Sequence, residues 1–420
     1  MEAGLYLNPY RSKKTGVKNV KGERIIYEST HNPSTAKPGD TLTVIVPRPS
    51  NLLIVPGTFA LLFDLEITSD DPTGTINTYV VNNLAANIFS RIKIKVGSTE
   101  IYDLDHAHLY NSYKDLWLTE KQRINLIESG IQDEELRKMR SKITVSLENV
   151  KDYNVILKNI YGKRYIVPLN FDLINDHMPL PTKNIEEDII FELTINQKEN
   201  ILVSGDIQKA DFELKNISIR YETLNNEILY SNINQSLYAG FLFLFDHIQH
   251  YKKIEIKKSD TLLNEQINVD RQSLKGILII FQEEFTPGKR DSESFSNPDI
   301  KDIKITIGTP NRLYDSGYKI QNQWTEIFKH FVPEDLKNGK DIYMDMVKYY
   351  TDKKYALWID LRCTEDNNLH NVGKIQEAKQ AIALEINKKN NGTGKYIMHI
   401  FIVADAGILI QNNKFGILNK

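Results

Sequence analysis

Short runs in which apolar and polar residues alternate recur along most of the chain. In the clearest run, Ile92, Ile94 and Val96 are separated by charged residues. A period of two places the apolar residues on one face of a β-strand and the charged residues on the other. This alternation, or an unbroken apolar run, predicts strands at 41–47, 58–67, 91–96, 188–195, 212–221, 252–258, 274–281, 303–307, 355–361, 382–387 and 396–404.

The strand predicted at 212–221 changes phase within its length. Phe212 and Leu214 share one face, whereas the apolar residues from Ile217 onward fall in the opposite phase. One extra residue in a strand produces such a slip. We therefore predict a β-bulge near Lys215-Asn216.

A helical period interrupts the strands in two places. Residues 105–118 and 318–331 each carry an aromatic stripe at helical spacing, and the charged segment 119–140 is expected to add further helix. Asp105 is available as the N-cap of the first helix. The stripes consist of Leu109, Tyr113, Leu116 and Trp117 in the first helix and Trp324, Ile327, Phe328 and Phe331 in the second.

The two halves of the chain repeat each other. Ile92–Ser98 matches Ile303–Thr309 at an offset of 211 residues, and an aromatic helix follows both. Three further correspondences keep the same order: Tyr102-Asp103 with Tyr314-Asp315, Ile195–Lys198 with Ile386–Lys389, and the opening strands Thr41–Pro47 with Lys252–Lys258. The offset falls to 191 by the third match. The first half therefore carries about twenty extra residues in its connections, which loops tolerate well.

A repeat of this length is a whole domain rather than a solenoid unit. The predicted fold class is all-β with helical insertions, as two tandem eight-stranded jelly-roll β-sandwiches, a double jelly roll. The expected organisation is a basic N-terminal arm at 1–40 with seven Lys or Arg residues, a first jelly roll at 41–224, a connector at 225–240 and a second jelly roll at 241–420.

Composition fits a soluble building block. The 420 residues are 41% hydrophobic and 26% charged, with a net charge of −2, so broad electrostatic capture of nucleic acid is not expected. The N-terminus lacks the apolar core of a secretory signal, and no apolar run is long enough for a transmembrane helix. Cys363, the single cysteine, lies in a strand-like run and is expected to be a buried thiol.

The segment Asp103–His108 most resembles a metal site because it contains a His-x-His pair. The pair falls at a predicted helix start, where His106 and His108 would point apart. The second half has Tyr314–Gly317 in its place, so the repeat does not preserve the histidines. We expect a helix cap here, and structural roles for His247 and His250.

Two other patterns also favour structure over chemistry. Gly392–Lys395 lacks the glycine spacing and the following helix of a phosphate loop, so a hairpin turn is expected. The carboxylates of Glu186-Glu187-Asp188 and Glu283-Glu284 could serve glycoside hydrolysis, but strand-end charges are usually solvated. The sequence predicts no catalytic residue, cofactor-binding residue, metal ligand or cofactor.

Several segments together resemble the double jelly-roll major capsid proteins of the adenovirus hexon, Polinton (adintovirus) and virophage lineage. They are Asn82–Gly97, Asp270–Gly276, Pro298–Gly308 with Leu313-Tyr314, and His399–Asn413. The resemblance is diffuse and covers the chain from about residue 40. It implies homotrimers whose six jelly rolls form a pseudo-hexagonal block, and blocks that tile an icosahedral shell around double-stranded DNA. The chain is shorter than hexon, so a low-profile capsomer is expected.

The resemblance predicts a structural protein without enzymatic activity, located in the virion capsid. It would be made in the host cytoplasm and assembled in the nucleus or a cytoplasmic factory. Its partners would be further copies of itself, penton or vertex proteins and minor capsid proteins. The arm at 1–40 would contact the genome or inner-face proteins weakly, or be a tail without a specific role. The alternatives are a secreted or cytosolic double jelly-roll glycan or amide hydrolase, which needs clustered acids in a cleft, and a glycan-binding module, which needs an exposed aromatic platform.

Overall fold

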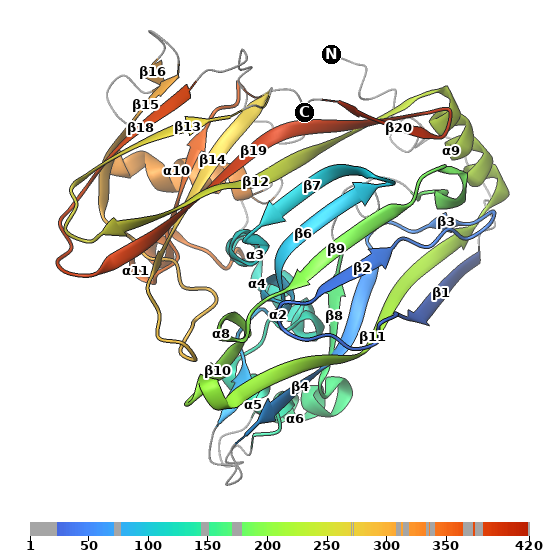
Figure 1. The fold of residues 1–420 in the computed structure, drawn as a ribbon, viewed down its shortest axis with the longest axis horizontal. Coiled ribbons are helices and arrows are strands. Elements are labelled where there is room, and N and C mark those ends of the chain that lie inside the picture. Colours follow the sequence, from blue (N-terminus) through green and yellow to red (C-terminus); the bar gives the residue numbers. More distant parts are fainter. Residues whose placement is uncertain are drawn as a thin grey trace.

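Antiparallel strands form four large sheets and one small sheet in the computed structural model of the chain (Figure 1). The structure describes residues 23–70, 77–143, 151–169, 179–269, 271, 273–307, 312–313, 319–332, 336, 341–363, 373 and 381–418. The large sheets pack in pairs, and each pair encloses much of one of two hydrophobic cores.

The first pair of sheets belongs to the first half of the chain. One sheet has the order β1 (Glu23–Thr30), β11 (Ala210–Asn225), β4 (Ala60–Ser69) and β8 (Arg164–Pro168), and β3 (Leu53–Ile54) also pairs with β11. The facing sheet has the order β2 (Thr41–Ile45), β9 (Ile189–Ile195), β6 (Phe89–Val96) and β7 (Thr99–Asp105). The short strands β5 (Thr78–Val80) and β10 (Leu202–Ser204) pair separately.

The second pair repeats this order. One sheet runs β12 (Phe241–Lys257), β19 (Lys395–Gln411), β14 (Leu274–Glu283) and β17 (Ala356–Asp360), with β20 (Lys414–Leu418) added to β19. The other runs β13 (Leu262–Asn268), β18 (Ala381–Lys388), β15 (Ile300–Ile307) and β16 (Arg312–Leu313). With the minor strands β3, β5, β10 and β20 set aside, each half places its first, eighth, third and sixth strands in one sheet. The second, seventh, fourth and fifth form the other. This is the jelly-roll order, and the predicted double jelly roll is confirmed.

The repeat found in the sequence follows this topology, with one exception. β6 and β15 are both the fourth strand of their sandwich, and β9 and β18 are both the seventh. The pairing of Thr41–Pro47 with Lys252–Lys258 is wrong, because the former contains β2, a second strand, and most of the latter is the end of β12, a first strand. The counterpart of β2 is β13. The match at Tyr314-Asp315 lies outside the described residues.

The domain limits also differ from those predicted. β1 lies inside the range assigned to the arm, yet all eight of its residues pair with β11, so the first sandwich includes residues 23–30 as well as the predicted range. Arm residues 1–22 lie outside the described part of the chain. The connector at 225–240 contains helix α9 (Glu227–Ala239), whose Asn226 side chain caps the N-terminus.

Helices fill the connections between strands. The described helices are α2 (Leu84–Asn87), α3 (Ala107–Asp115), α4 (Glu120–Asn125), α5 (Glu134–Arg140), α6 (Asp152–Tyr161), α8 (Lys198–Ile201), α9, α10 (Ile320–Phe331) and α11 (Met346–Thr351), with 3-10 turns at Ile127–Ser129, Thr182–Asn184 and Ile207–Lys209. In both halves an aromatic helix follows the fifth strand, as predicted. None of these helices is both long and apolar enough to cross a bilayer.

Three local predictions can be compared with the structure. The bulge is confirmed, since the register of β11 against β4 shifts between Lys215 and Ser218. The N-cap of α3 is His106 rather than Asp105, whose carboxylate instead accepts the His106 N–H at 2.8 Å. The prediction of a buried Cys363 thiol is wrong: β17 ends at Asp360, Arg362 turns back to pair with that carboxylate, and Cys363 is exposed.

Candidate functional site

The two jelly rolls meet at a junction built around α3. This helix belongs to the first half of the chain, yet its buried residues lie in the core cluster of the second sandwich. Leu109, Tyr113 and Leu116 are at most 1% exposed. The helical stripe predicted from the sequence therefore packs into the core of the neighbouring domain.

Aromatic rings make most of this contact. The Tyr113 ring meets Phe295 and Phe331 edge-on, with centroids 5.1 and 5.5 Å apart. Trp117 stacks on Phe331 and lies 5.4 Å from Trp324 on α10. Aromatic pairs add stabilisation beyond their buried area. The junction is therefore packed as a domain core, not as a loose domain contact.

A buried ion pair also crosses the junction. Arg123, which lies on α4, donates to the Glu293 carboxylate at 2.7 Å, and both side chains are less than a tenth exposed. The same carboxylate accepts from the Asn82 amide at 3.0 Å. Arg123 also lies over the Tyr343 ring at 4.3 Å. Because each charge is satisfied, the pair can be buried here without an unpaired ion.

Asn82 connects three segments at this point. Its side-chain oxygen accepts the backbone N–H groups of Asn83 and Gln132, and its backbone oxygen accepts the Ser292 hydroxyl at 2.6 Å. Asn82-Asn83 was one of the segments on which the family resemblance rested. Through these hydrogen bonds Asn82 ties the first half of the chain to the segment that carries Ser292 in the second half.

The contact is reciprocal. β12 and β19 are each 17 residues long, and one end of this pair reaches the first sandwich (Figure 1). The Phe243 and Phe245 side chains of β12 and the Ile408 and Ile410 side chains of β19 belong to the first core cluster. Each domain thus contributes side chains to the core of the other, and the two form one interlocked block.

Three histidines lie together on one side of this junction. His106 precedes α3, His250 lies on β12 and His399 on β19, and the side-chain nitrogens they offer all lie within 4.8 Å of one another. His250 Nε2 and His399 Nδ1 are 3.1 Å apart. Burial lowers the pKa of His250 to about 4 and that of His399 to about 2, with the neighbouring imidazoles adding to both shifts. Burial also lowers the pKa of His106.

The sequence missed this group because its members are 144 and 149 residues apart, counted from His106 to His250 and from His250 to His399. The predicted His-x-His pair is not its basis. His108 is buried beneath the helix start, and it is not among the three nitrogens that converge. His247, three residues before His250, instead packs edge-on against Tyr102.

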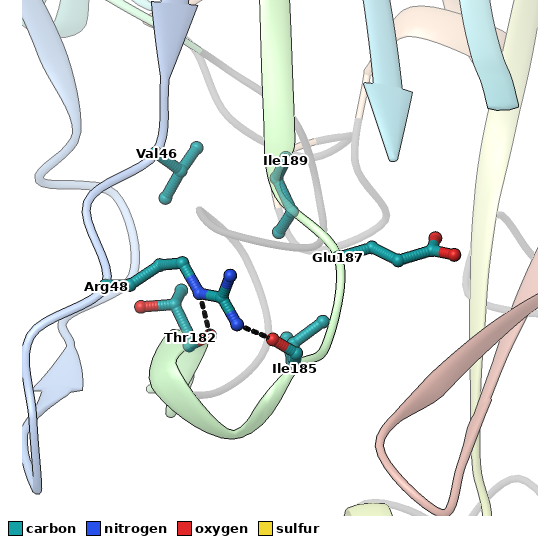
Figure 2. A pocket seen from close by; sticks show the side chains of 6 residues that line it. All are labelled: Val46, Arg48, Thr182, Ile185, Glu187 and Ile189. Atoms are coloured by element: carbon teal, nitrogen blue, oxygen red, sulfur yellow. Dashed lines mark hydrogen bonds between the residues drawn. The ribbon is translucent and has the colours of Figure 1, made fainter. Parts of the chain in front are cut away.

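The acidic cluster at 186–188 does not form a paired-carboxylate site. Figure 2 shows the adjoining recess, where the Arg48 guanidinium reaches toward the backbone of Thr182 and Ile185 while Glu187 points away. Arg48 also pairs with Asp188 at 2.9 Å, and Glu186 lies 3.6 Å from Lys414. The recess is too narrow to hold a water molecule.

The other two chemical candidates are also accounted for by structure. Glu283 pairs with Lys258 at 2.6 Å and with Lys353 at 3.1 Å, which lowers the pKa of the carboxyl, whereas Glu284 is exposed. Gly392 and Gly394 occupy a turn with positive φ, and Lys395 begins β19 and pairs with Glu255. This turn is not the predicted hairpin, because β18 and β19 belong to different sheets.

No known protein-family model and no curated protein matches the sequence. Among solved structures, the fold is similar to PBCV-1 VP54 as fitted into the virophage Sputnik, with a TM-score of 0.61 and 10% identity over 96% of this chain and 98% of that one. The Sputnik virophage structure gives 0.59 and 9%, and the mavirus major capsid protein 0.54 and 10%, each covering 97% of this chain and 91% of the other. The chain therefore has the double jelly-roll fold of viral major capsid proteins.

Proposed function

We propose that the chain is a structural major capsid protein whose homotrimers act as pseudo-hexameric blocks of an icosahedral shell around a double-stranded DNA genome. The observation that carries this proposal is the match of both sandwiches, in order, to viral capsid proteins over nearly the whole chain. A likeness confined to one jelly roll would carry less weight, because that fold serves many functions.

The geometry is suited to such a block. Two sandwiches with one strand order give nearly equivalent outlines, so three chains present six similar units. A cyclic trimer repeats one heterologous interface three times and then closes. The interlocked cores support this role, because a subunit that flexed between its domains would blur the six-fold outline.

The surface supplies apolar area that an assembly could bury. Large apolar side chains are more than half exposed on three helices: Ile156 and Ile160 on α6, Ile228 and Tyr238 on α9, and Met346 and Val347 on α11. A net charge of −2 keeps repulsion between neighbouring copies low. Both features support self-association.

Further partners follow from the proposed role. Penton or vertex proteins and minor capsid proteins would fill the sites that the trimers leave. The basic residues near the N-terminus would lie on the inner face, close to the genome or to inner proteins. The location would be the virion capsid, after synthesis in the host cytoplasm and assembly in the nucleus or a cytoplasmic factory.

The proposed role is not enzymatic. Of the carboxylates considered for hydrolysis, Asp188 and Glu283 are held in ion pairs at strand ends, and the known proteins of similar fold are capsid proteins. No comparison supports the hydrolase alternative.

Light scattering of the purified full chain tests the proposal. A trimer of about 146 kDa, three times the 48.5 kDa of the chain, is expected. A monomer that stays monodisperse across salt concentration and pH would contradict it.

A further inference from the structure

We propose that His106, His250 and His399 form a transition-metal site, suited best to Zn²⁺, that fastens the first jelly roll to the second. The site goes beyond the proposed capsid role and does not depend on it. Its ligands come from both domains, since His106 lies between β7 and α3 and the other two lie on paired strands of the second sandwich.

The donor set fits a borderline metal ion. Neutral imidazole nitrogen is a preferred ligand of Zn²⁺, and three such ligands with one open position make a known type of tetrahedral site. In such a site the nitrogens are about 3.3 Å apart, because each Zn–N bond is about 2.0 Å. The facing nitrogens of His250 and His399 are 3.1 Å apart, close to that spacing, and one nitrogen of each of the three rings lies within 4.8 Å of the others.

His106 is one of the described non-glycine residues with a positive φ. Its φ of 50° and ψ of 33° place it in the left-handed region, which is unfavourable for most side chains. This conformation turns the His106 ring toward the sheet, 4.5 Å from the His250 ring and 4.9 Å from the His399 ring.

Access and charge also permit binding. The His106 side chain is 29% exposed, whereas His399 is buried, so the group opens toward solvent on one side. At neutral pH the lowered pKa values of all three rings leave their lone pairs free of competing protons. Asp105 places a carboxylate oxygen 3.9 Å from His106 Nε2, which offsets the nearby positive charges of Lys253 and Arg290.

Metal titration of the full chain, stripped with a chelator and dialysed, tests the proposal. Calorimetry should show one Zn²⁺ per chain, with a Kd of about 1 µM or tighter. Co²⁺ should bind with the visible absorption of tetrahedral coordination. Saturating Zn²⁺ should raise the melting temperature by about 3–5 °C, because it binds only the folded state.

Two variants and a control locate the site. His106→Asn keeps a residue that tolerates the left-handed conformation, and His250→Gln keeps a polar side chain on β12. Each should weaken Zn²⁺ binding at least about tenfold and remove the Co²⁺ spectrum. His247→Gln, on the same strand but outside the trio, should leave both unchanged. Absence of Zn²⁺ binding to the wild type, or equal affinity in both variants and the wild type, would overturn the proposal.

Discussion

The two jelly rolls share one strand order but differ in how they use the connection between the fifth and sixth strands. In the first domain this connection carries α3, α4, α5 and α6, and α3 packs into the core of the other domain. In the second domain it carries α10 and α11, and α10 packs against β17 of its own sandwich. The strand frames, meaning the eight ordered strands of each sandwich, are therefore equivalent, whereas the connections between the fifth and sixth strands are not.

This difference separates two requirements on the chain. Sandwiches of equivalent strand order would give the proposed trimer six similar outlines, and unequal connections allow one domain to anchor in the other. If each domain inserted a helix into the core of the other, the connection between the fifth and sixth strands would have to pack into the other domain in both halves. Here the contribution of the second domain is different: the ends of its long strands β12 and β19 fill part of the first core. The interlock is thus asymmetric although the frames are alike.

The largest expected effect comes from a cavity made where α3 packs into the second domain. Tyr113→Ala removes a fully buried ring that meets Phe295 and Phe331, and should cost about 3–5 kcal/mol of unfolding free energy. Hydrogen exchange should show lost protection in β14 and β17 of the second domain, although the substitution lies in the first. Tyr153→Ala, on half-exposed Tyr153 of α6 in the same connection, is the control and should change stability little. Loss of protection confined to the first sandwich would refute the crossing.

A smaller loss is expected from the buried ion pair across the junction. Arg123→Met leaves Glu293 charged and buried, and should cost about 3 kcal/mol. Adding Glu293→Leu should recover part of that loss, since the unpaired charge is then removed. Denaturant unfolding of both variants measures this. The matched control is Lys304→Met in the exposed pair with Glu385, for which less than about 1 kcal/mol is expected. If Arg123→Met and Lys304→Met lowered the unfolding free energy equally, the Arg123–Glu293 pair would not act as a buried ion pair.

The bulges provide a finer test of the comparison. In the first domain the eighth strand itself bulges, and Asn216 there has a φ of 49°. In the corresponding sheet of the second domain the register shifts fall instead on β12 and β14, the neighbours of the eighth strand. Asn216→Ala should cost about 1 kcal/mol, because it loses both tolerance of the left-handed region and the hydrogen bond to Asp64. Asn216→Gly should cost less unfolding free energy than Asn216→Ala. Thermal unfolding compares the two variants, and a lower melting temperature for Asn216→Gly would contradict this account of the bulge.

The last expected effect is a pH dependence located in the second domain. The His330 ring stacks on Trp358 with centroids 3.5 Å apart, and burial lowers its pKa well below the ordinary value, with Arg362, Lys275 and Lys114 adding to the shift. The folded state keeps this ring neutral, whereas the unfolded chain takes up a proton below about pH 6.5. Stability should therefore fall as the pH drops below that value, with this ring contributing up to about 1.4 kcal/mol per pH unit.

The variant His330→Gln isolates that contribution. It removes the titrating ring, so its plot of unfolding free energy against pH should be shallower between pH 6.5 and 5 than that of the wild type. Parallel plots for the two proteins would show that His330 does not titrate on unfolding.

Strands with a clear inner face could be predicted from the sequence. β2, β6 and β15 alternate, and their inward apolar residues are buried as expected except Ile92 of β6, which is partly buried. β1 could not be predicted, because seven of its eight residues are exposed and no period marks an edge strand of this kind. The false match at Lys252–Lys258 arose because β12 is 17 residues long and one segment of it resembles a separate strand.

The junction and the histidine group could not be predicted from the sequence for a different reason. The stripe on α3 indicates burial but not the partner that buries it, and Arg123 and Glu293 are 170 residues apart. The contacts among His106, His250 and His399 depend on the packing of one domain against the other. Sequence spacing carries no information about such a contact, whereas the repeated strand order could be found within the chain itself.

Imaging the purified trimer tests most directly the claim that two interlocked, equivalent frames make a six-fold block. Class averages viewed along the three-fold axis should show a compact outline with six nearly equal lobes, the same from particle to particle. A trimer with three lobes, or one whose two domains vary in angle between particles, would contradict the account.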